Sequence, residues 1–181
     1  MKNLKKNIHL TLRKTEEREY PAVTDISVEV WKHAYKGIID DAFLNSISSE
    51  ARLKGRIKWL AEPNKYSFIA LYKDKIIGFC DFGISRHLEY GKGEIYAIYV
   101  LPEHHGKGAG AMLLKHAMHI LEQKELTPYI VIALEKNITA NSFYEKMGFH
   151  FIDTITANIG NTTYPENVYR RSDIYKHKAM K

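Results

Sequence analysis

The segment EIYAIYVLPEHHGKGAGAMLL, residues 94–114, constrains the fold more than any other part of the chain. Its first eight residues are rich in β-branched and aromatic side chains, which predicts a strand over 94–101. A proline and a cluster of glycines follow, and both are typical of a turn. From about residue 108 to residue 122 the apolar side chains recur at helical spacing. The segment therefore predicts a strand, a glycine-rich turn and an amphipathic helix in direct succession.

The glycine-rich turn has the composition of a phosphate-binding loop. Gly106, Gly108 and Gly110 lack a Cβ, so the backbone can take a positive φ and approach a ligand closely. The N–H groups at the start of the following helix point outward together, and a helix N-terminus carries roughly half a positive charge. Lys107 adds a cation beside them. These features predict a site for phosphate or pyrophosphate.

Two general phosphate-binding motifs compete for this turn. A Walker A loop needs Ser or Thr after its Gly-Lys pair, whereas Gly106 and Lys107 precede Gly108, so that motif is excluded. A dinucleotide fingerprint of the form GxGxxA is met by Gly106, Gly108 and Ala111, with Glu135 near the end of the next strand. Four residues separate its first glycine from the strand, and a hairpin precedes that strand. A dinucleotide-binding oxidoreductase is the alternative that this fingerprint leaves open.

The same turn resembles the cofactor-binding motif of the GNAT acyltransferase superfamily. That motif is a Gln or Arg, two residues, Gly, one residue, then Gly or Ala, and its positions here hold His105, Gly108 and Gly110. His105 departs from the pattern. The segment NITANSFYEKMGF, residues 137–149, is similar to the second conserved block of the family, and the order of elements fits from about residue 8 to residue 176.

The resemblance implies an α/β (α+β) fold with a mixed, splayed central sheet flanked by helices. It also implies an enzyme that moves an acetyl group from acetyl-CoA to a primary amine by direct attack. The acceptor would be a small molecule, such as a polyamine or an amino acid, or a peptide. A non-catalytic acyl-CoA-binding module is a further alternative, against which the matching positions Asn137 and Tyr144 count.

The resemblance also implies which residues hold the acyl donor. The pantetheine arm would contact the main chain of the central strand, where an N–H near Val100 would polarise the thioester carbonyl. Asn137 matches the asparagine that meets the pantetheine amide, and Tyr144 matches the tyrosine that protonates the departing thiolate. Their alternative roles are a helix cap for Asn137 and packing for Tyr144. The implied cofactor residues are Ile98, Tyr99, Val100, His105, Gly106, Lys107, Gly108, Ala109, Gly110, Ala111, Asn137 and Tyr144.

The attacking amine must lose a proton, because an alkylamine has a pKa of about 10. Glu94 is the candidate base, since strand alternation would place it on one face with Tyr96, Ile98 and Val100. Its alternative role is that of a solvated acid at the strand edge.

Aromatic and acidic residues of the first helix and the loop after it are candidates for binding the acceptor. Trp31 and Tyr35 could enclose an amine that Asp40 and Asp41 attract, although spacing also fits Trp31 and Tyr35 as core residues. Tyr164 and Tyr169 have the same two interpretations.

The remaining periodicities predict the other elements. These are a strand over 9–12, a helix from a Thr24 cap to Ile38, a helix from Ser48 to before Pro63, a hairpin over 66–72 and 76–84, a strand over 129–134, a helix over 140–146 ending at Gly148, and strands over 150–156 and 168–175. The strand–helix–strand order predicts a right-handed crossover with a parallel pair. Because no linker interrupts the chain, we expect residues 1–181 to form one domain.

Composition restricts the surroundings of the protein. A single cysteine, Cys80, cannot form an intramolecular disulfide, and neither a signal peptide nor a membrane span is recognisable, so we expect a cytosolic protein without membrane partners. The excess of 27 Lys and Arg over 21 Asp and Glu lies mostly near the ends, and we expect no nucleic-acid partner. His104, His105, His116 and His119 do not form a convincing metal set, so no metal is expected. The oligomeric state is open between a monomer and a homodimer.

Overall fold

The computed structural model describes residues 9–172, and their strands form one seven-stranded sheet in the order β1-β2-β3-β4-β5-β7-β6. All neighbouring strands are antiparallel except β4 and β5, which are parallel. The strands are β1 (Leu10–Lys14), β2 (Lys65–Tyr72), β3 (Lys75–Ile84), β4 (Gly93–Val100), β5 (Tyr129–Leu134), β6 (His150–Ile159) and β7 (Thr162–Arg171). The predicted mixed sheet is confirmed.

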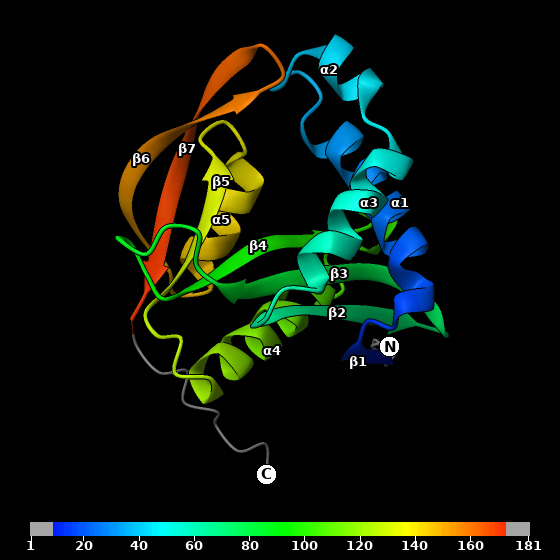
Figure 1. Ribbon diagram of the computed structural model, residues 1–181, viewed down its shortest axis with the longest axis horizontal. Coiled ribbons are helices and arrows are strands. Elements are labelled where there is room, and N and C mark those ends of the chain that lie inside the picture. The colour runs from blue at the N-terminus through cyan, green and yellow to red at the C-terminus, as the bar shows by residue number, and fades with distance from the viewer. Residues whose placement is uncertain (1–8, 173–181) are drawn as a thin grey trace, which may run out of the picture.

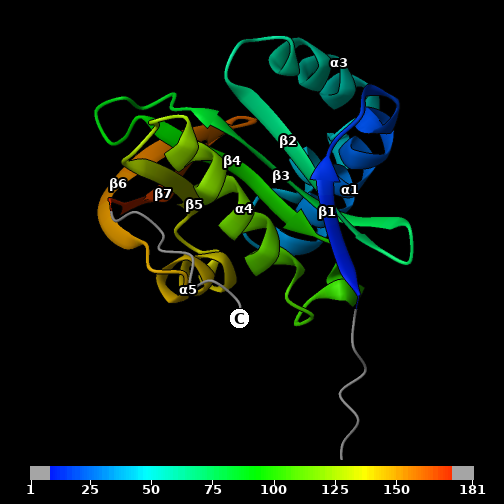
Figure 2. The ribbon, with the colours of Figure 1, turned by 90° about the horizontal axis from the view of Figure 1, so that it is seen from below.

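Helices cover both faces of this sheet. The α-helices are α1 (Tyr20–Ala34), α2 (Asp41–Ser46), α3 (Ser49–Leu60), α4 (Ala109–Gln123) and α5 (Ile138–Lys146), and two 3-10 turns are η1 (Glu17–Glu19) and η2 (Pro102–His104). α1 and α3 lie on one face of β2, β3 and β4, and α4 lies on the other (Figures 1 and 2). No helix within residues 9–172 is long and apolar enough to cross a membrane.

The central strands separate part of the way along their length. β4 and β5 pair only where Gly93–Ile95 lie beside Tyr129–Val131. Beyond that point β5 turns away with β6 and β7, so the described sheet has two leaves, as Figure 1 shows. The predicted splay is therefore present, and one edge of β4 has no neighbouring strand from Tyr96 to Val100 among residues 9–172.

The polar groups on this open edge belong to alternate residues. Leu101 N–H donates to Ile77 O of β3 at 2.9 Å. Because backbone polar groups alternate between the two edges of a strand, those of Val100 and Ile98 point the other way, into the gap between β4 and β5. The end of β4 thus offers main-chain donors and acceptors to whatever fills the gap.

A β-bulge interrupts the pairing of β3 with β4. Asp81 lies opposite Ala97, whereas Phe82 lies opposite Ile95, so Tyr96 is the extra residue on β4. A residue inserted in this way reverses the inward and outward alternation of the side chains that follow it.

The bulge changes the face on which Glu94 lies. Ile95, Ile98 and Val100 all belong to the core beneath α4, whereas Tyr99 packs in the core against α1. The prediction that Glu94 shares a face with Ile98 and Val100 is therefore wrong, because unbroken alternation was assumed across the bulge.

The first helix begins earlier than expected. Pro21 lies in the first turn of α1, where a missing N–H is tolerated, and Thr24 lies inside the helix with its Oγ1 donating to Tyr20 O at 2.7 Å. The predicted Thr24 cap and the extension to Ile38 are wrong. The six-residue α2, capped by the side chain of Asp40, was not predicted.

The closing hairpin reaches back to the region after α1. β7 lies between β5 and β6, and near the turn of the hairpin Tyr164 Oη accepts a hydrogen bond from the backbone N–H of Asp40 at 3.0 Å. Of the strand predicted over 168–175, residues 173–175 lie outside the described residues.

The core contains the single cysteine. Cys80 is fully buried on β3, and burial raises the pKa of its thiol well above the usual value. Both observations make Cys80 a structural thiol and not a nucleophile.

Candidate active site

A cavity of about 740 Å³ lies along the gap between β4 and β5. Its walls come from the open part of β4, the start of α4, β5, the start of α5 and the end of α1. They comprise Val30, His33, Ala34, Tyr35, Tyr96, Ala97, Ile98, Tyr99, Val100, His104, His105, Gly106, Gly108, Ala109, Gly110, Ala111, Val131, Ile132, Ala133, Asn137, Thr139, Ala140, Phe143 and Tyr144. The volume is within the range of cofactor and substrate sites. Of the predicted cofactor residues, only Lys107 is not part of the wall.

The glycine-rich turn brings the start of α4 to this cavity. Gly106 and Gly108 have φ angles of +71° and +88°, and nothing lies within 4 Å of where a Cβ would stand on either. No side chain caps α4, so the first N–H groups of the helix, on Ala109, Gly110 and Ala111, have no acceptor within it. All three residues line the cavity. The turn is therefore suited to bind a phosphate group, because it offers free backbone donors, the positive end of the helix dipole and enough space.

His105 and Lys107 bind neighbouring main-chain groups. His105 Nε2 lies 2.7 Å from Val100 O, and because a carbonyl only accepts, the ring nitrogen donates. This contact connects the turn to the end of β4. Lys107 Nζ donates to Glu103 O at 2.6 Å, and Lys107 does not line the cavity. Its cation therefore does not lie where the sequence predicted it, beside the phosphate site.

Asn137 and Tyr144 both reach the cavity from the α5 region. Asn137 Oδ1 accepts from Ala140 N–H at 3.1 Å, so it also caps α5. Tyr144 is 6% exposed and packs against Phe143, Phe149 and Tyr169. Its hydroxyl forms no hydrogen bond with the residues that the structure describes. Burial raises the pKa of Tyr144 well above its usual value, so the phenol keeps its proton and can donate it.

The two predicted acceptor residues differ in position. Tyr35 lines the cavity from the end of α1, and burial raises the pKa of its phenol. Trp31 does not line this cavity, and its Nε1 donates to Tyr99 Oη at 2.9 Å. The prediction that Trp31 contacts the acceptor has no support from its position, because its indole fixes the Tyr99 ring instead.

Glu94 is fully buried and lies outside the cavity wall. Its carboxylate accepts hydrogen bonds from Arg86 N at 2.8 Å and from Arg86 Nε at 3.1 Å, and it forms an ion pair with Arg86 Nη2. This geometry holds the loop between β3 and β4 against the sheet. It gives no support to Glu94 as the base, because the carboxylate faces Arg86 and not the gap.

Sequence reasoning missed two residues that form the site. Asn141 is buried, and its Nδ2 donates to Leu134 O at 3.1 Å and Glu135 O at 2.9 Å, which fixes the turn from β5 into α5. Its position four residues after Asn137 in a helix was the available signal. His33 lines the cavity from α1, and nothing in its sequence neighbourhood indicated this. Within residues 9–172 no cluster of three or more His, Cys, Asp or Glu could hold a metal ion.

The glycine turn at the start of α4 lies beside the open edge of β4, and this arrangement is that of an acyl-transfer fold. Comparison with known proteins identifies the family. Residues 31–149 match the model of the acetyltransferase (GNAT) family, and the chain belongs to this family. The predicted acyltransferase class is confirmed. The glycine turn is therefore that of an acetyltransferase and not of a dinucleotide-binding oxidoreductase.

Individual relatives agree with this assignment. The chain is 31% identical over 130 residues to an uncharacterized N-acetyltransferase of Bacillus subtilis, YuaI, covering 71% of this chain and 73% of the relative. It is 26% identical over 150 residues to a spermidine N(1)-acetyltransferase of Thermoplasma acidophilum, covering 80% and 91%. The crystal structure of a PaiA N-acetyltransferase from Thermoplasma acidophilum, in complex with coenzyme A, matches with a TM-score of 0.74 at 23% identity over 91% of this chain and 99% of that one.

Proposed function

We propose that this chain is an acetyl-CoA-dependent N-acetyltransferase that transfers the acetyl group directly to a primary amine. The observation that carries the proposal is the single cavity that joins the open edge of β4 to the uncapped start of α4. A pyrophosphate and an extended amide arm need these two sets of main-chain groups, in this order. The coenzyme A in the Thermoplasma structure supports the same choice of donor.

The donor is bound mainly by main-chain groups. The N–H groups at Ala109, Gly110 and Ala111 bind the pyrophosphate, and the open edge of β4 at Ile98 and Val100 pairs with the pantetheine amides. His105 can take the place of the usual Gln or Arg because its contact with Val100 O positions the turn without using the backbone donors.

Two groups act on the reacting thioester. The N–H of Ile98, next to Val100 on the open edge and further from the glycine turn, faces the gap and stabilises negative charge that develops on the thioester carbonyl oxygen. The phenol of Tyr144 donates to the sulfur as the C–S bond breaks and the thiolate gains charge. Because its pKa is raised, Tyr144 is a weak acid that acts mainly by donating a hydrogen bond to the sulfur and transfers its proton late.

The acceptor enters on the α1 face, where Tyr35 and His33 line the cavity. No Asp or Glu lines it among the described residues, so the amine's proton passes to His33 or to water on this face. The proposed acceptor is a primary amine of a small molecule or peptide. We also propose one domain over residues 1–181, because all described strands share one sheet. The cytosolic location and the monomer-or-homodimer alternative stay predictions.

The proposal is tested by incubating the full chain with acetyl-CoA and a panel of amines while thiol release is recorded. Amine-dependent thiol release, with the acetylated amine detected by mass spectrometry, is the expected result. Binding of acetyl-CoA without transfer to any amine would favour the non-catalytic module instead.

A further inference from the structure

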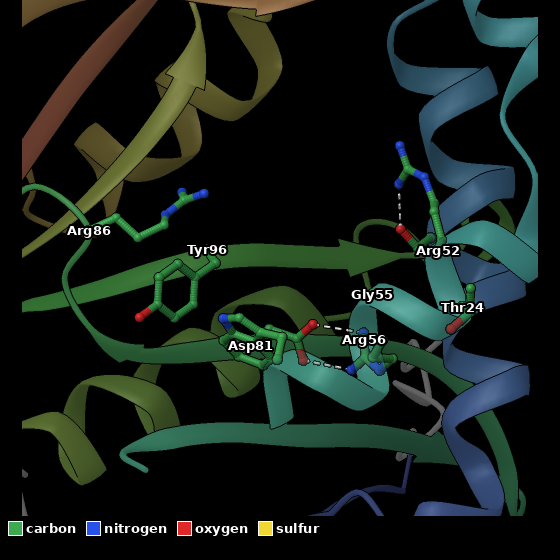
Figure 3. Close-up of a pocket in the computed structure, with 9 residues that line it drawn as sticks. Thr24, Arg52, Gly55, Arg56, Asp81, Arg86 and Tyr96 are labelled. Carbon is green, nitrogen blue, oxygen red and sulfur yellow. Dashed lines mark hydrogen bonds and ion pairs between the residues drawn. The ribbon is translucent and has the colours of Figure 1, made fainter. Parts of the chain in front are cut away.

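A second cavity, of about 300 Å³, lies beside the first on the α1 and α3 face of the sheet. Tyr96, at the bulge in β4, lines both cavities. Figure 3 shows Arg52 extending from α3 on one side of the smaller cavity and Arg86 reaching in from the loop before β4 on the other. A molecule with its amine in the gap could therefore extend past Tyr96 into this space.

The lining of the smaller cavity is cationic. Three arginines, Arg52, Arg56 and Arg86, line it together with one acid, Asp81. Arg56 already has an acidic partner, because its guanidinium donates to both carboxylate oxygens of Asp81 at 2.7 Å. Arg86 binds Glu94 through its Nε and Nη2, but its side chain is 57% exposed and can still contact a ligand.

Arg52 has no acidic partner among residues 9–172. Its Nη1 donates to Ser27 Oγ at 2.9 Å, and its guanidinium lies 4.2 Å from the centre of the Trp31 ring. Burial lowers the pKa of Arg52, which reflects the loss of water around an uncompensated charge. The two contacts hold the guanidinium in one orientation and leave its Nε and Nη2 without described partners. This pair of donors matches the two oxygens of a carboxylate or a similar oxyanion.

We infer that the smaller cavity binds an oxyanion group of the amine acceptor, with Arg52 as its main ligand and Arg86 as a second. This inference rests on the proposed function and narrows it: the acceptor is a small amine that carries a carboxylate or phosphonate, as an amino acid does. A polyamine would place additional positive charge beside the arginines, which disfavours it electrostatically.

The first test compares acceptors matched in their amine but carrying a carboxylate, a phosphonate or no anionic group. The anionic members are expected to have the higher kcat/KM, and the better of the two identifies the group. In Arg52→Gln their kcat/KM should fall about 10- to 100-fold, as expected when a charge-assisted hydrogen bond is lost, while the matched neutral amine is unaffected. A preference for the matched neutral amine, or an unchanged preference in Arg52→Gln, would overturn the inference.

A second pair of variants avoids altering the Arg52 packing. Gly55 lines the cavity on α3, and nothing lies within 4 Å of where its Cβ would stand. Gly55→Asp and Gly55→Asn therefore fit equally well and differ only in charge. The Asp variant should weaken anionic acceptors about tenfold relative to the Asn variant and leave neutral amines unchanged. Equal effects of Asp and Asn would contradict an anion site.

Binding separates this inference from the proposed function. In the presence of CoA, calorimetric titration with the anionic acceptor should show binding that Arg52→Gln and Gly55→Asp weaken. If this binding is found without transfer to any amine, the anion site stands and the proposed acetyl transfer fails. If transfer occurs but neither variant weakens the anionic acceptor, the anion site fails and the transfer stands.

Discussion

Tyr144→Phe tests the proposed acid with little disturbance of the fold. The substitution keeps the ring that packs against Phe143, Phe149 and Tyr169 and removes only the hydroxyl. Since that hydroxyl has no hydrogen-bond partner among the described residues, the free energy of unfolding should change by less than about 0.5 kcal/mol. The melting temperature should therefore stay within about 2 °C of the parent.

Turnover should fall although stability does not. A hydrogen bond to a group gaining full charge contributes about 1.5–3 kcal/mol, which corresponds to a loss of roughly 10- to 100-fold in kcat. This lies at the lower end of general acid catalysis, because a thiolate leaves partly unaided and the raised pKa makes Tyr144 a weak acid. The KM for acetyl-CoA should change little, since the bond forms only as the sulfur gains charge.

The assay is thiol release with any accepted amine, recorded beside melting curves. Tyr169→Phe is the matched control, because its ring centre lies 6.3 Å from that of Tyr144 but its side chain does not line the cavity. The control should keep the parental kcat. Parental turnover in Tyr144→Phe would refute the reasoning and make Tyr144 a packing residue.

Three further substitutions test the other assigned roles. Glu94→Gln should lower the free energy of unfolding by about 1.5–3 kcal/mol, because its ion pair with Arg86 is lost. It should keep the parental kcat when assayed below its melting temperature. A loss of 10²-fold or more in kcat would instead identify Glu94 as the base. His33→Gln should lower kcat/KM about tenfold at pH 7, and the loss should shrink toward pH 10, where about half of the amine is already neutral. A loss independent of pH would contradict proton transfer to His33. Burial lowers the pKa of His116 in the folded protein. As the pH falls from about 7 to 5, His116 therefore gains its proton more readily in the unfolded chain, and the free energy of unfolding should fall by at most about 1.4 kcal/mol per pH unit. Unfolding curves of His116→Phe should show a smaller decline with pH, and an identical decline would exclude His116 as its source.

The elements that could be predicted from the sequence are those whose signals are local. β5 runs over the expected residues 129–134, where a short apolar run offers no other periodicity, and Ser48 caps α3 as its side chain indicates. The start of α1 was missed because Thr24 resembles a cap while Pro21 was the stronger signal. The insertion of β7 between β5 and β6 depends on pairing between distant segments, which the periodicity of a single strand does not encode.

The site residues also fall into those with a local sequence signal and those whose place depends on distant segments. The glycine turn and the α5 block could be predicted because their residue types follow from backbone geometry and spacing. The role of Glu94 could not, because the bulge at Tyr96 arises from pairing with β3 and leaves no mark in the sequence of β4. The smaller cavity was missed for a related reason: Arg52 on α3, Asp81 on β3 and Arg86 in the loop before β4 come from separate elements that only the folded chain brings together.

Calorimetric titration of CoA into the parent chain and two Gly108 variants tests the central claim, that the glycine turn and the gap beside β4 hold the acyl donor. Gly108→Asn and Gly108→Asp share the strain of a φ of +88° and both have room for a side chain, so they differ only in charge. The parent should bind CoA and acetyl-CoA in preference to NAD and ATP. The Asp variant should bind CoA at least about tenfold more weakly than the Asn variant, because its carboxylate would lie beside the pyrophosphate. Equal CoA affinity in the two variants, or tighter binding of NAD than of CoA by the parent, would contradict the account.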